Sequence, residues 1–256
     1  MAPVRWPLSL LLLAHAAPAA RPPAIQQYVT HPGFQWKCES AEHFEFCLEA
    51  SLESDVYLAA ARNSAELART RILQTFGAAD YTPQVYVFFV ESPERMQKLI
   101  GYHGEGRARP AQHAIFFVPT RIRPDLTHEL THEILTNLWG AAEAWIEEGF
   151  AALQAEPFAV HRTCLSMAVR QVLLPLPALV NATWNPAQYS PDITYVELGG
   201  FVEFLQARYG TERVKKIWQQ GSASIPRVLG KPLTSVETEW RSALDQEVAR
   251  RWPPRN

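Results

Sequence analysis

The residues best suited to chemistry form the motif His128-Glu129-x-x-His132. Four residues advance an α-helix by about 400°, so the two imidazoles lie on one face and can reach one metal ion. Glu129 lies about 100° from His128 around the helix, where its carboxylate can contact a water bound to that ion. Imidazole ligands, an acidified water and a carboxylate base are what zinc-assisted hydrolysis requires. The motif therefore predicts one Zn²⁺ ion held by His128 and His132, with Glu129 as general base.

A catalytic zinc site also needs a third protein ligand and keeps one position open. The next acidic residues downstream are Glu147 and Glu148, on a second helical segment. A turn near 140–142 would fold this segment back against the first helix and bring a glutamate to the metal, but periodicity leaves open which one. The alternative to a metal site is a solvated helix with two unrelated histidines. With eight histidines in 256 residues, an accidental match is expected far less than once.

The His-Glu-x-x-His motif and the downstream Trp-x-x-Glu-Gly-Phe-Ala segment at 145–151 resemble the zinc-site motifs of the gluzincin metallopeptidases, most closely their compact peptidase-MA-like branch. The resemblance implies that His128, His132 and Glu148 bind zinc and that Glu129 is the general base. In that family the ligand is the glutamate directly before glycine, which favours Glu148 over Glu147. The likeness extends over most of residues 40–245.

Two departures from the zinc aminopeptidases argue against an aminopeptidase. Position 147 is Glu where their motif has Asn, so a second carboxylate stands beside the ligand. The strand expected at 111–118 lacks the Gly-x-Met-Glu-Asn motif that captures a free substrate N-terminus in those enzymes. The resemblance therefore implies an endopeptidase, or cleavage of an unusual amide.

Two further residues are candidates for contact with substrate. Tyr195 resembles a recurrent tyrosine of the family and could donate its phenolic hydrogen to the oxyanion of a tetrahedral intermediate. The alternative is a core aromatic at the start of a helix. His113, on a strand expected to border the cleft, could contact the substrate backbone, and the alternative is an ordinary edge residue. Composition and spacing do not decide between the two roles of either residue.

The elements that must position these residues divide into two groups. Strand patterns occur at 43–48, 84–90 and 111–118, with a helix expected at about 55–76, another from Ser92 and a turn-rich loop at 101–110. The later patterns are helical, at about 125–139, 143–155, 159–174, 195–209, 211–220 and 233–250. This distribution predicts an α+β fold. We expect one peptidase-MA-like catalytic domain over 37–252, with a strand-rich N-terminal lobe at 37–124 around a mixed sheet, the zinc helix at the cleft and a helical C-terminal lobe.

Residues 1–20 have the three parts of a secretory signal, with a positive start at Arg5, an apolar run at 8–14 and small residues at 17–19. The apolar run is shorter than the roughly 20 residues of a membrane-spanning helix, so we expect cleavage and export to a periplasmic or extracellular compartment. Residues 21–36 are proline-rich without periodicity, which predicts an extended lead-in. In an oxidising compartment Cys38 and Cys47 could form a disulfide and leave Cys164 unpaired; three reduced thiols are the alternative.

Composition excludes several classes of protein. Hydrophobic residues make up 47% and charged residues 20%, which is too apolar for a disordered chain. A formal charge of -2 argues against nucleic acid as a partner. We expect a monomeric, exported peptidase that acts on a peptide or protein substrate and has no stable membrane span after signal cleavage. The alternative is a secreted binding or scaffold protein with a structural zinc site, closed by a fourth protein ligand such as Glu147.

Overall fold

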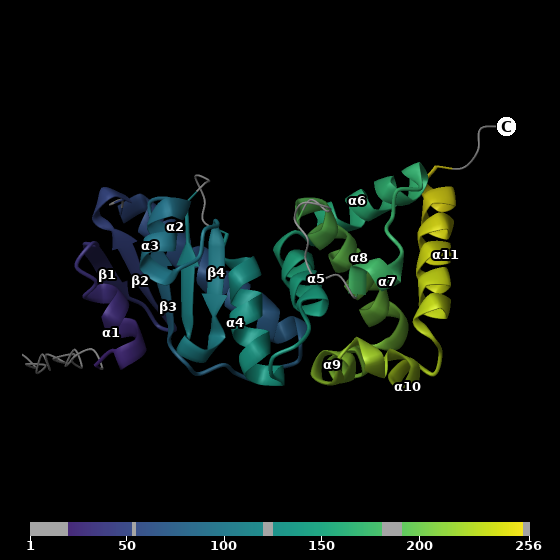
Figure 1. The fold of residues 1–256 in the computed structure, drawn as a ribbon, viewed down its shortest axis with the longest axis horizontal. Helices are drawn as coiled ribbons and strands as arrows, with labels where there is room; N and C mark the ends of the chain where they lie inside the picture. Colours follow the sequence, from purple (N-terminus) through teal and green to yellow (C-terminus); the bar gives the residue numbers. More distant parts are fainter. Residues whose placement is uncertain (1–19, 53–54, 120–124, 181–190, 253–256) are drawn as a thin grey trace, which may run out of the picture.

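The computed structural model describes residues 20–52, 55–119, 125–180 and 191–252, which form two lobes side by side (Figure 1). The N-terminal lobe contains a five-stranded mixed sheet, and the C-terminal lobe is made of helices. The predicted α+β class is therefore confirmed. Except for Ala20, the predicted signal at 1–20 lies outside the described residues. No helix within the described ranges is long and apolar enough to cross a membrane.

The sheet has the strand order β1-β2-β3-β5-β4. The strands are β1 (Trp36–Ser40), β2 (Phe44–Glu49), β3 (Val85–Phe89), β4 (Gly106–Arg109) and β5 (Ala114–Phe117). β2, β3 and β5 are parallel to one another, while β1 and β4 lie antiparallel to their neighbours at the two edges. The prediction of a loop at 101–110 is wrong for residues 106–109, which form β4. The Gly-Arg-Ala-Arg sequence of this strand has no β-branched or aromatic residue to indicate a strand. The strand predicted from 111 begins only at Ala114, because Pro110–Gln112 forms a 3-10 turn.

Helices cover both faces of the sheet. α2 (Asp55–Thr75) and α4 (Thr127–Trp139) pack on the face that presents Val87 and Ile115. α1 (Pro23–Val29) and α3 (Pro93–Ile100) pack on the other face, which presents Phe88 and Phe116. Adjacent residues of a strand serve opposite layers because side chains alternate along it. α4 also contributes Leu135 and Trp139 to the core of the C-terminal lobe, so this helix joins the two lobes.

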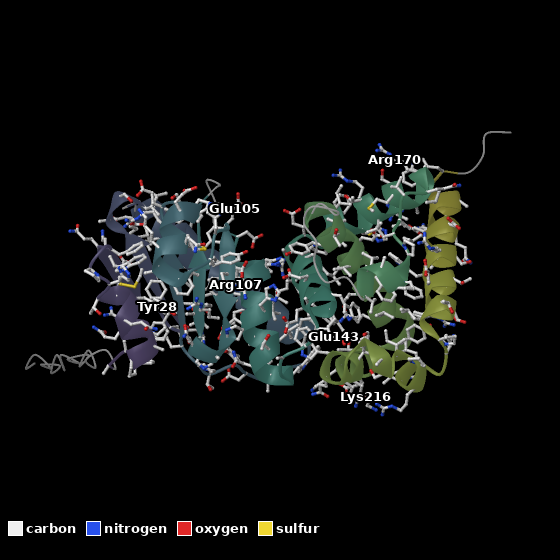
Figure 2. The ribbon with its side chains drawn as sticks, viewed as in Figure 1. Tyr28, Glu105, Arg107, Glu143, Arg170 and Lys216 are labelled. Atoms are coloured by element: carbon white, nitrogen blue, oxygen red, sulfur yellow. A yellow bond between two sulfur atoms is a disulfide. The ribbon has the colours of Figure 1, made fainter. Side chains whose placement is uncertain are left out.

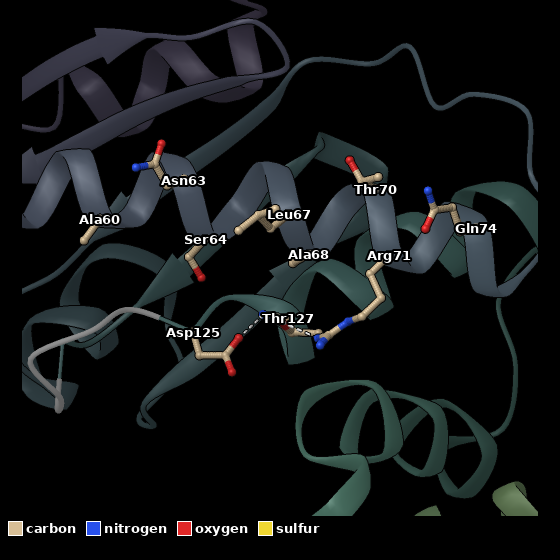
Figure 3. Close-up of a pocket in the computed structure, with 10 residues that line it drawn as sticks. All are labelled: Ala60, Asn63, Ser64, Leu67, Ala68, Thr70, Arg71, Gln74, Asp125 and Thr127. Carbon is tan, nitrogen blue, oxygen red and sulfur yellow. Dashed lines mark hydrogen bonds between the residues drawn. The ribbon is translucent and has the colours of Figure 1, made fainter.

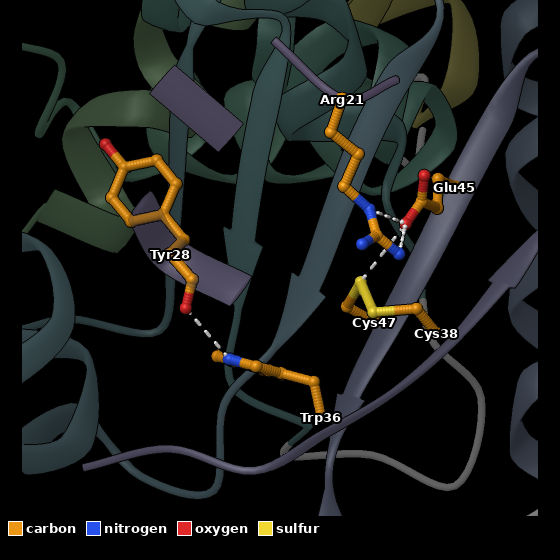
Figure 4. The surroundings of a disulfide bond; sticks show 6 residues. All are labelled: Arg21, Tyr28, Trp36, Cys38, Glu45 and Cys47. Atoms are coloured by element: carbon orange, nitrogen blue, oxygen red, sulfur yellow. Dashed lines mark hydrogen bonds and ion pairs between the residues drawn. A yellow bond between two sulfur atoms is a disulfide. The ribbon is translucent and has the colours of Figure 1, made fainter. Parts of the chain in front are cut away.

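The extended lead-in predicted for 21–36 is wrong, because this segment contains α1. Pro23 occupies the start of the helix, where its fixed backbone angle and missing N–H are tolerated. Ile25 and Tyr28 are buried, and the Tyr28 carbonyl accepts a hydrogen bond of 3.0 Å from Trp36 Nε1 (Figure 4). Two buried positions three residues apart are too short a pattern to predict a helix from sequence.

The predicted disulfide between Cys38 and Cys47 is confirmed (Figure 4). The two cysteines lie opposite each other on β1 and β2. Beside them, Arg21 pairs with Glu45 at 2.6 Å, which ties the residues before α1 to β2. Cys164, in the C-terminal lobe, is buried and free.

The C-terminal lobe surrounds an aromatic core that includes Phe150, Phe201, Trp218 and Trp240. Its helices are α5 (Ala144–Ala155), α6 (Pro157–Arg170), α7 (Leu176–Val180), α8 (Pro191–Tyr209), α9 (Thr211–Gln220), α10 (Ile225–Leu229) and α11 (Leu233–Arg251). The remaining 3-10 turns are Ala50–Leu52 and Ser222–Ser224. The helices predicted for α4, α5, α9 and α11 are confirmed within two residues at each end. α7 and α10 have five residues each, too few to show a periodic pattern.

Candidate zinc site

Three side chains from two helices converge where the lobes meet. His128 and His132 lie one turn apart on α4, and Glu148 reaches them from α5. The two Nε2 atoms are 3.2 Å apart. Glu148 Oε2 lies 3.2 Å from His128 Nε2 and 3.5 Å from His132 Nε2. The structure thus brings together the three ligands predicted from the sequence, which we call the triad.

The spacing within the triad fits a zinc ion. Ligand atoms about 2.0–2.1 Å from Zn²⁺ at tetrahedral angles are about 3.3 Å apart. The three distances in the triad, from 3.2 to 3.5 Å, agree with this value. Glu148 Oε2 is also buried without a hydrogen-bond partner, which suits an oxygen that ligates a metal. Two imidazole nitrogens and a carboxylate oxygen form a donor set that zinc takes in catalytic sites, so these residues can hold one ion.

Charges within the triad support metal binding at neutral pH. Burial raises the pKa of Glu148, but the nearby imidazoles of His128 and His132 outweigh it and lower the pKa to about 2. For His132, burial disfavours the charged imidazolium, yet the adjacent Glu148 carboxylate and the charges of Glu129 and Glu147 raise its pKa overall. The pocket is therefore electronegative and attracts a proton to His132 or, in its place, a cation.

The turn between α4 and α5 is fastened to the C-terminal lobe. Trp218 Nε1 donates a hydrogen bond of 2.6 Å to the Gly140 carbonyl. Glu143 accepts hydrogen bonds from Trp145 Nε1 at 2.8 Å and from the Ser222 N–H at 2.9 Å. These contacts fix the direction in which α5 leaves the turn, and hence the position of Glu148.

Close packing of α5 on α8 explains why Gly149 follows Glu148. A Cβ at this position would lie 2.7 Å from Val202 Cγ2 and 3.0 Å from the Leu198 carbonyl oxygen. Both of these atoms belong to α8, on which α5 packs more extensively than on any other helix of the described residues. Only a residue without a side chain lets α5 approach α8 this closely, so the Glu-Gly pair has a packing cause as well as a chemical one.

The start of α4 is braced by α2. Arg71 donates a hydrogen bond to Thr127 Oγ1 at 3.2 Å, and the Thr127 N–H donates to Asp125 Oδ1 at 2.9 Å (Figure 3). Arg71 also donates to the Gln154 carbonyl oxygen at 2.8 Å. Arg71 thereby ties α2 to α4 and α5 at once. A cavity of about 880 Å³ lies beside these residues along α2. It contains none of the predicted catalytic or ligating side chains, so we place the site instead in the smaller cavity at the triad.

Glu129 lies against the backbone of the edge strand. The side chain is buried, with 8% of its residue surface exposed, and it lines a cavity of about 440 Å³ together with the triad. A Cβ at Gly106 of β4 would lie 3.0 Å from Glu129 Cδ and closer still to Oε1. Glycine at 106 therefore makes room for the carboxylate of the predicted general base.

Other walls of this cavity come from β4 and α8. Tyr102, Arg107 and Ala108, which the sequence did not single out, line it on the side of β4, and Tyr195, a predicted substrate contact, lines it from α8. The Tyr195 ring lies 5.9 Å from the His128 ring. Burial, and then the charge of Glu148, raise the pKa of Tyr195, so its hydroxyl stays protonated at neutral pH. The sequence did not predict β4, because its Gly106 and Ala108 merely alternate with two arginines.

His113 does not line the cavity of the triad. It caps the 3-10 turn before β5 with φ of 52°, and its Nδ1 lies 2.9 Å from Glu133 Oε1. The same oxygen accepts hydrogen bonds from Tyr81 Oη at 2.6 Å and Asn137 Nδ2 at 3.2 Å. We call Tyr81, His113, Glu133 and Asn137 the Glu133 clamp. The substrate contact proposed for His113 therefore stays a prediction, and the structure places its imidazole in the clamp instead of in the wall of the cavity.

Glu147, the other glutamate of the pair, is engaged elsewhere. Its Oε1 accepts a hydrogen bond of 3.0 Å from the Ala142 N–H, at the turn that precedes α5. It lines the cavity but does not belong to the cluster of metal-ligating atoms found in the described residues. Its charge helps to raise the pKa of His132.

Comparison with known proteins adds no relative. No model of a protein family matches the chain, and no curated protein has significant sequence similarity to it.

Proposed function

We propose that the protein is an exported, zinc-dependent peptidase of the gluzincin type, with zinc bound by the triad and Glu129 as general base. The observation that carries the proposal is the triangle of ligand atoms, with sides of 3.2, 3.2 and 3.5 Å that suit one tetrahedral ion. Zinc in such a site supplies Lewis acidity, which lowers the pKa of a bound water and polarises a carbonyl oxygen. The motif resemblance supports a peptide bond as the bond that is cleaved.

Glu129 and Tyr195 have distinct roles in the proposed reaction. The Glu129 carboxylate accepts a proton from the attacking water and passes it to the leaving amine as the C–N bond breaks. The Tyr195 hydroxyl, which burial keeps protonated, donates a hydrogen bond to the oxyanion that develops on the carbonyl oxygen. Both side chains line the same cavity as the triad, from α4 and from α8.

The number of ligating residues favours a catalytic zinc over a structural one. The cluster of ligating atoms within the described ranges holds three residues, and a structural site needs four. Glu147, the candidate for a fourth ligand, caps the turn before α5 instead. The remaining side of the triad borders the cavity of about 440 Å³, which is large enough for a segment of substrate.

Export is supported by two independent features. The predicted signal occupies the first 20 residues, and a disulfide joins Cys38 to Cys47. Disulfides persist in oxidising compartments and are rare where thiols are kept reduced.

The test compares wild type with Glu129→Gln. We expect stoichiometric zinc in both proteins by elemental analysis, and a rate of hydrolysis about 10²- to 10⁴-fold lower in the variant on a peptide library. Glu212→Gln, an exposed change on α9, is the control and should hydrolyse as wild type does. Wild-type protein without zinc, or a Glu129→Gln variant with full activity, would refute the proposal.

A further inference from the structure

We propose that Arg107 and Tyr102 form a carboxylate-binding subsite of the cavity, which selects peptide substrates that carry a carboxylate close to the scissile bond. The inference rests on the proposed peptidase function. It specifies the substrate class: a peptide with an aspartate or glutamate side chain, or with its free C-terminal carboxylate, at that place.

Arg107 is the one arginine or lysine among the described residues that line the cavity of the triad. It belongs to β4, the edge strand, and directly follows Gly106, against which the Glu129 carboxylate lies. Figure 2 shows it on the side of the N-terminal lobe that faces the C-terminal lobe. Its charge also reaches across the cavity, because it is one of the charges that act on the pKa of Tyr195.

Arg107 has no carboxylate partner among the described residues. Its guanidinium lies over the ring of Tyr102, with the guanidinium carbon 5.2 Å from the ring centroid. In the same lobe, by contrast, Arg62, Arg69 and Arg95 each pair with a carboxylate. A guanidinium that is stacked but not paired keeps its N–H donors available for a bidentate contact with a carboxylate.

The Tyr102 ring lies against the guanidinium of Arg107, and Gly104 makes room for this ring. A Cβ at Gly104 would lie 2.5 Å from Tyr102 Cε1, so a larger residue there would displace the ring. The ring lines the cavity on one side and stacks with Arg107. Stacking on an aromatic ring limits the side-chain freedom of an exposed arginine, which lowers the entropy lost when it binds an anion.

The negative charge of the cavity means that an acidic substrate needs a cation there to bind. Glu129, Glu147 and Glu148 all line it and would repel an acidic substrate. Arg107 lines the cavity from β4, whereas Glu147 and Glu148 line it from α5, so an acidic group can bind at the arginine while the scissile bond lies near the triad.

The test measures binding, so that it does not depend on turnover. Zinc-loaded Glu129→Gln protein is titrated with acetylated, amidated hexapeptides that carry Glu or Gln at each position in turn. We expect the Glu peptide to bind about tenfold more tightly than the Gln peptide at one position or more. Peptides with a free or an amidated C-terminus, all other residues being neutral, distinguish a C-terminal carboxylate from a side chain.

Variants at position 107 decide the assignment. In the Glu129→Gln background, Arg107→Ala should bring the Glu-to-Gln affinity ratio, or the acid-to-amide ratio, close to one. Arg107→Glu should instead favour Lys peptides, a gain that a folding defect cannot produce. The control is Arg162→Ala, which removes another exposed arginine lying over a ring, that of Phe158 on α6, and should leave the ratio unchanged. Tyr102→Ala should lower the ratio more than Tyr102→Phe.

Failure of this inference is separable from failure of the peptidase proposal. Equal ratios with and without Arg107, or no carboxylate preference at all, would overturn the subsite even if wild type cleaves peptides. Absence of cleavage by wild type would overturn the peptidase, while a ratio that depends on Arg107 would still support the subsite.

Discussion

Glu129 and Glu133 lie one turn apart on the same face of α4, yet the regions around them differ. Glu129 borders an open cavity, beside the bare backbone of Gly106 and the triad. Glu133 is fully buried, and one of its oxygens collects contacts from Tyr81, His113 and Asn137. One region leaves groups available to a ligand, whereas the other uses the same residue types to hold the helix in place.

The two histidine–glutamate groups differ in the same way at the atomic level. Glu133 and Glu148 each have a buried oxygen without a hydrogen-bond partner. In Glu148 that oxygen is Oε2, the one that faces both imidazoles of the triad. In Glu133 it is Oε2 as well, but the contact with His113 goes to Oε1, which already accepts other hydrogen bonds. Two imidazole nitrogens that converge on an unpartnered carboxylate oxygen, rather than proximity of His to Glu, therefore distinguish the candidate metal site from a structural network.

The largest difference between the two regions is expected when one histidine is removed from each. His132→Ala should abolish stoichiometric zinc and, with it, all peptidase activity above background, because two ligands do not hold the ion. His113→Ala should keep full zinc content. Elemental analysis of both purified variants checks this. If His113→Ala loses zinc as completely as His132→Ala, the division between triad and clamp is wrong.

The sequence could predict the two histidines of the triad from their helical spacing. The choice of Glu148 over Glu147 came from the resemblance to a family whose ligand directly precedes glycine, and the packing that requires this glycine is visible only in the folded chain. The α+β order of elements could also be predicted, since the long helices and the buried strand β3 have clear periodic or apolar patterns.

The clamp and β4 could not be predicted in this way. Glu133 acquires its role from Tyr81 and His113, which precede β3 and β5, so only the tertiary fold brings them to α4. A weak signal existed in the repeat of the His-Glu dipeptide at 132–133, one turn after 128–129. β4 depends on pairing with β5 along one edge, and its short polar sequence carries no sign of that partner.

Removing the carboxylate at the centre of the clamp should affect stability rather than metal content. Glu133→Ala leaves the Tyr81 hydroxyl buried without its 2.6 Å acceptor and opens a cavity. We expect the free energy of unfolding to fall by about 3 kcal/mol. Urea denaturation of the zinc-loaded protein measures this. Glu133→Gln, which keeps an acceptor oxygen, is the matched variant and should lose less. A stable Glu133→Ala protein without zinc would reverse the roles of the two regions.

A smaller effect is expected from Gly106→Ala, which disturbs the open region alone. The new Cβ would displace the end of the Glu129 side chain, because it would lie 3.0 Å from Cδ. We expect kcat to fall about tenfold, since a misplaced base is a poor proton acceptor, with zinc content and stability unchanged. Gly33→Ala is the control, because a Cβ there would meet only ordinary contacts at 3.5 Å. An unchanged kcat in Gly106→Ala would contradict the role of Glu129 as general base.

The smallest effect concerns pH and separates the triad with its ion from the triad without it. In metal-free protein the pKa of His132 is raised, so its ion pair stabilises the fold fully below the ordinary value near 6.5 and is lost as pH rises through the folded pKa. The pKa of Glu148 is lowered to about 2, so its contribution is present above about 4.5 and is lost only at lower pH.

Zinc needs neutral imidazoles, so a proton on His132 competes with the ion. The difference in unfolding free energy between zinc-loaded and EDTA-treated protein should therefore narrow between pH 8 and pH 6, by up to about 1.4 kcal/mol per pH unit for each proton displaced. Urea denaturation at both pH values measures it. His132→Ala should show no zinc-dependent difference at either pH, whereas His113→Ala should behave as wild type. A difference that stays constant with pH in wild type would mean that the ion does not displace a proton from the triad.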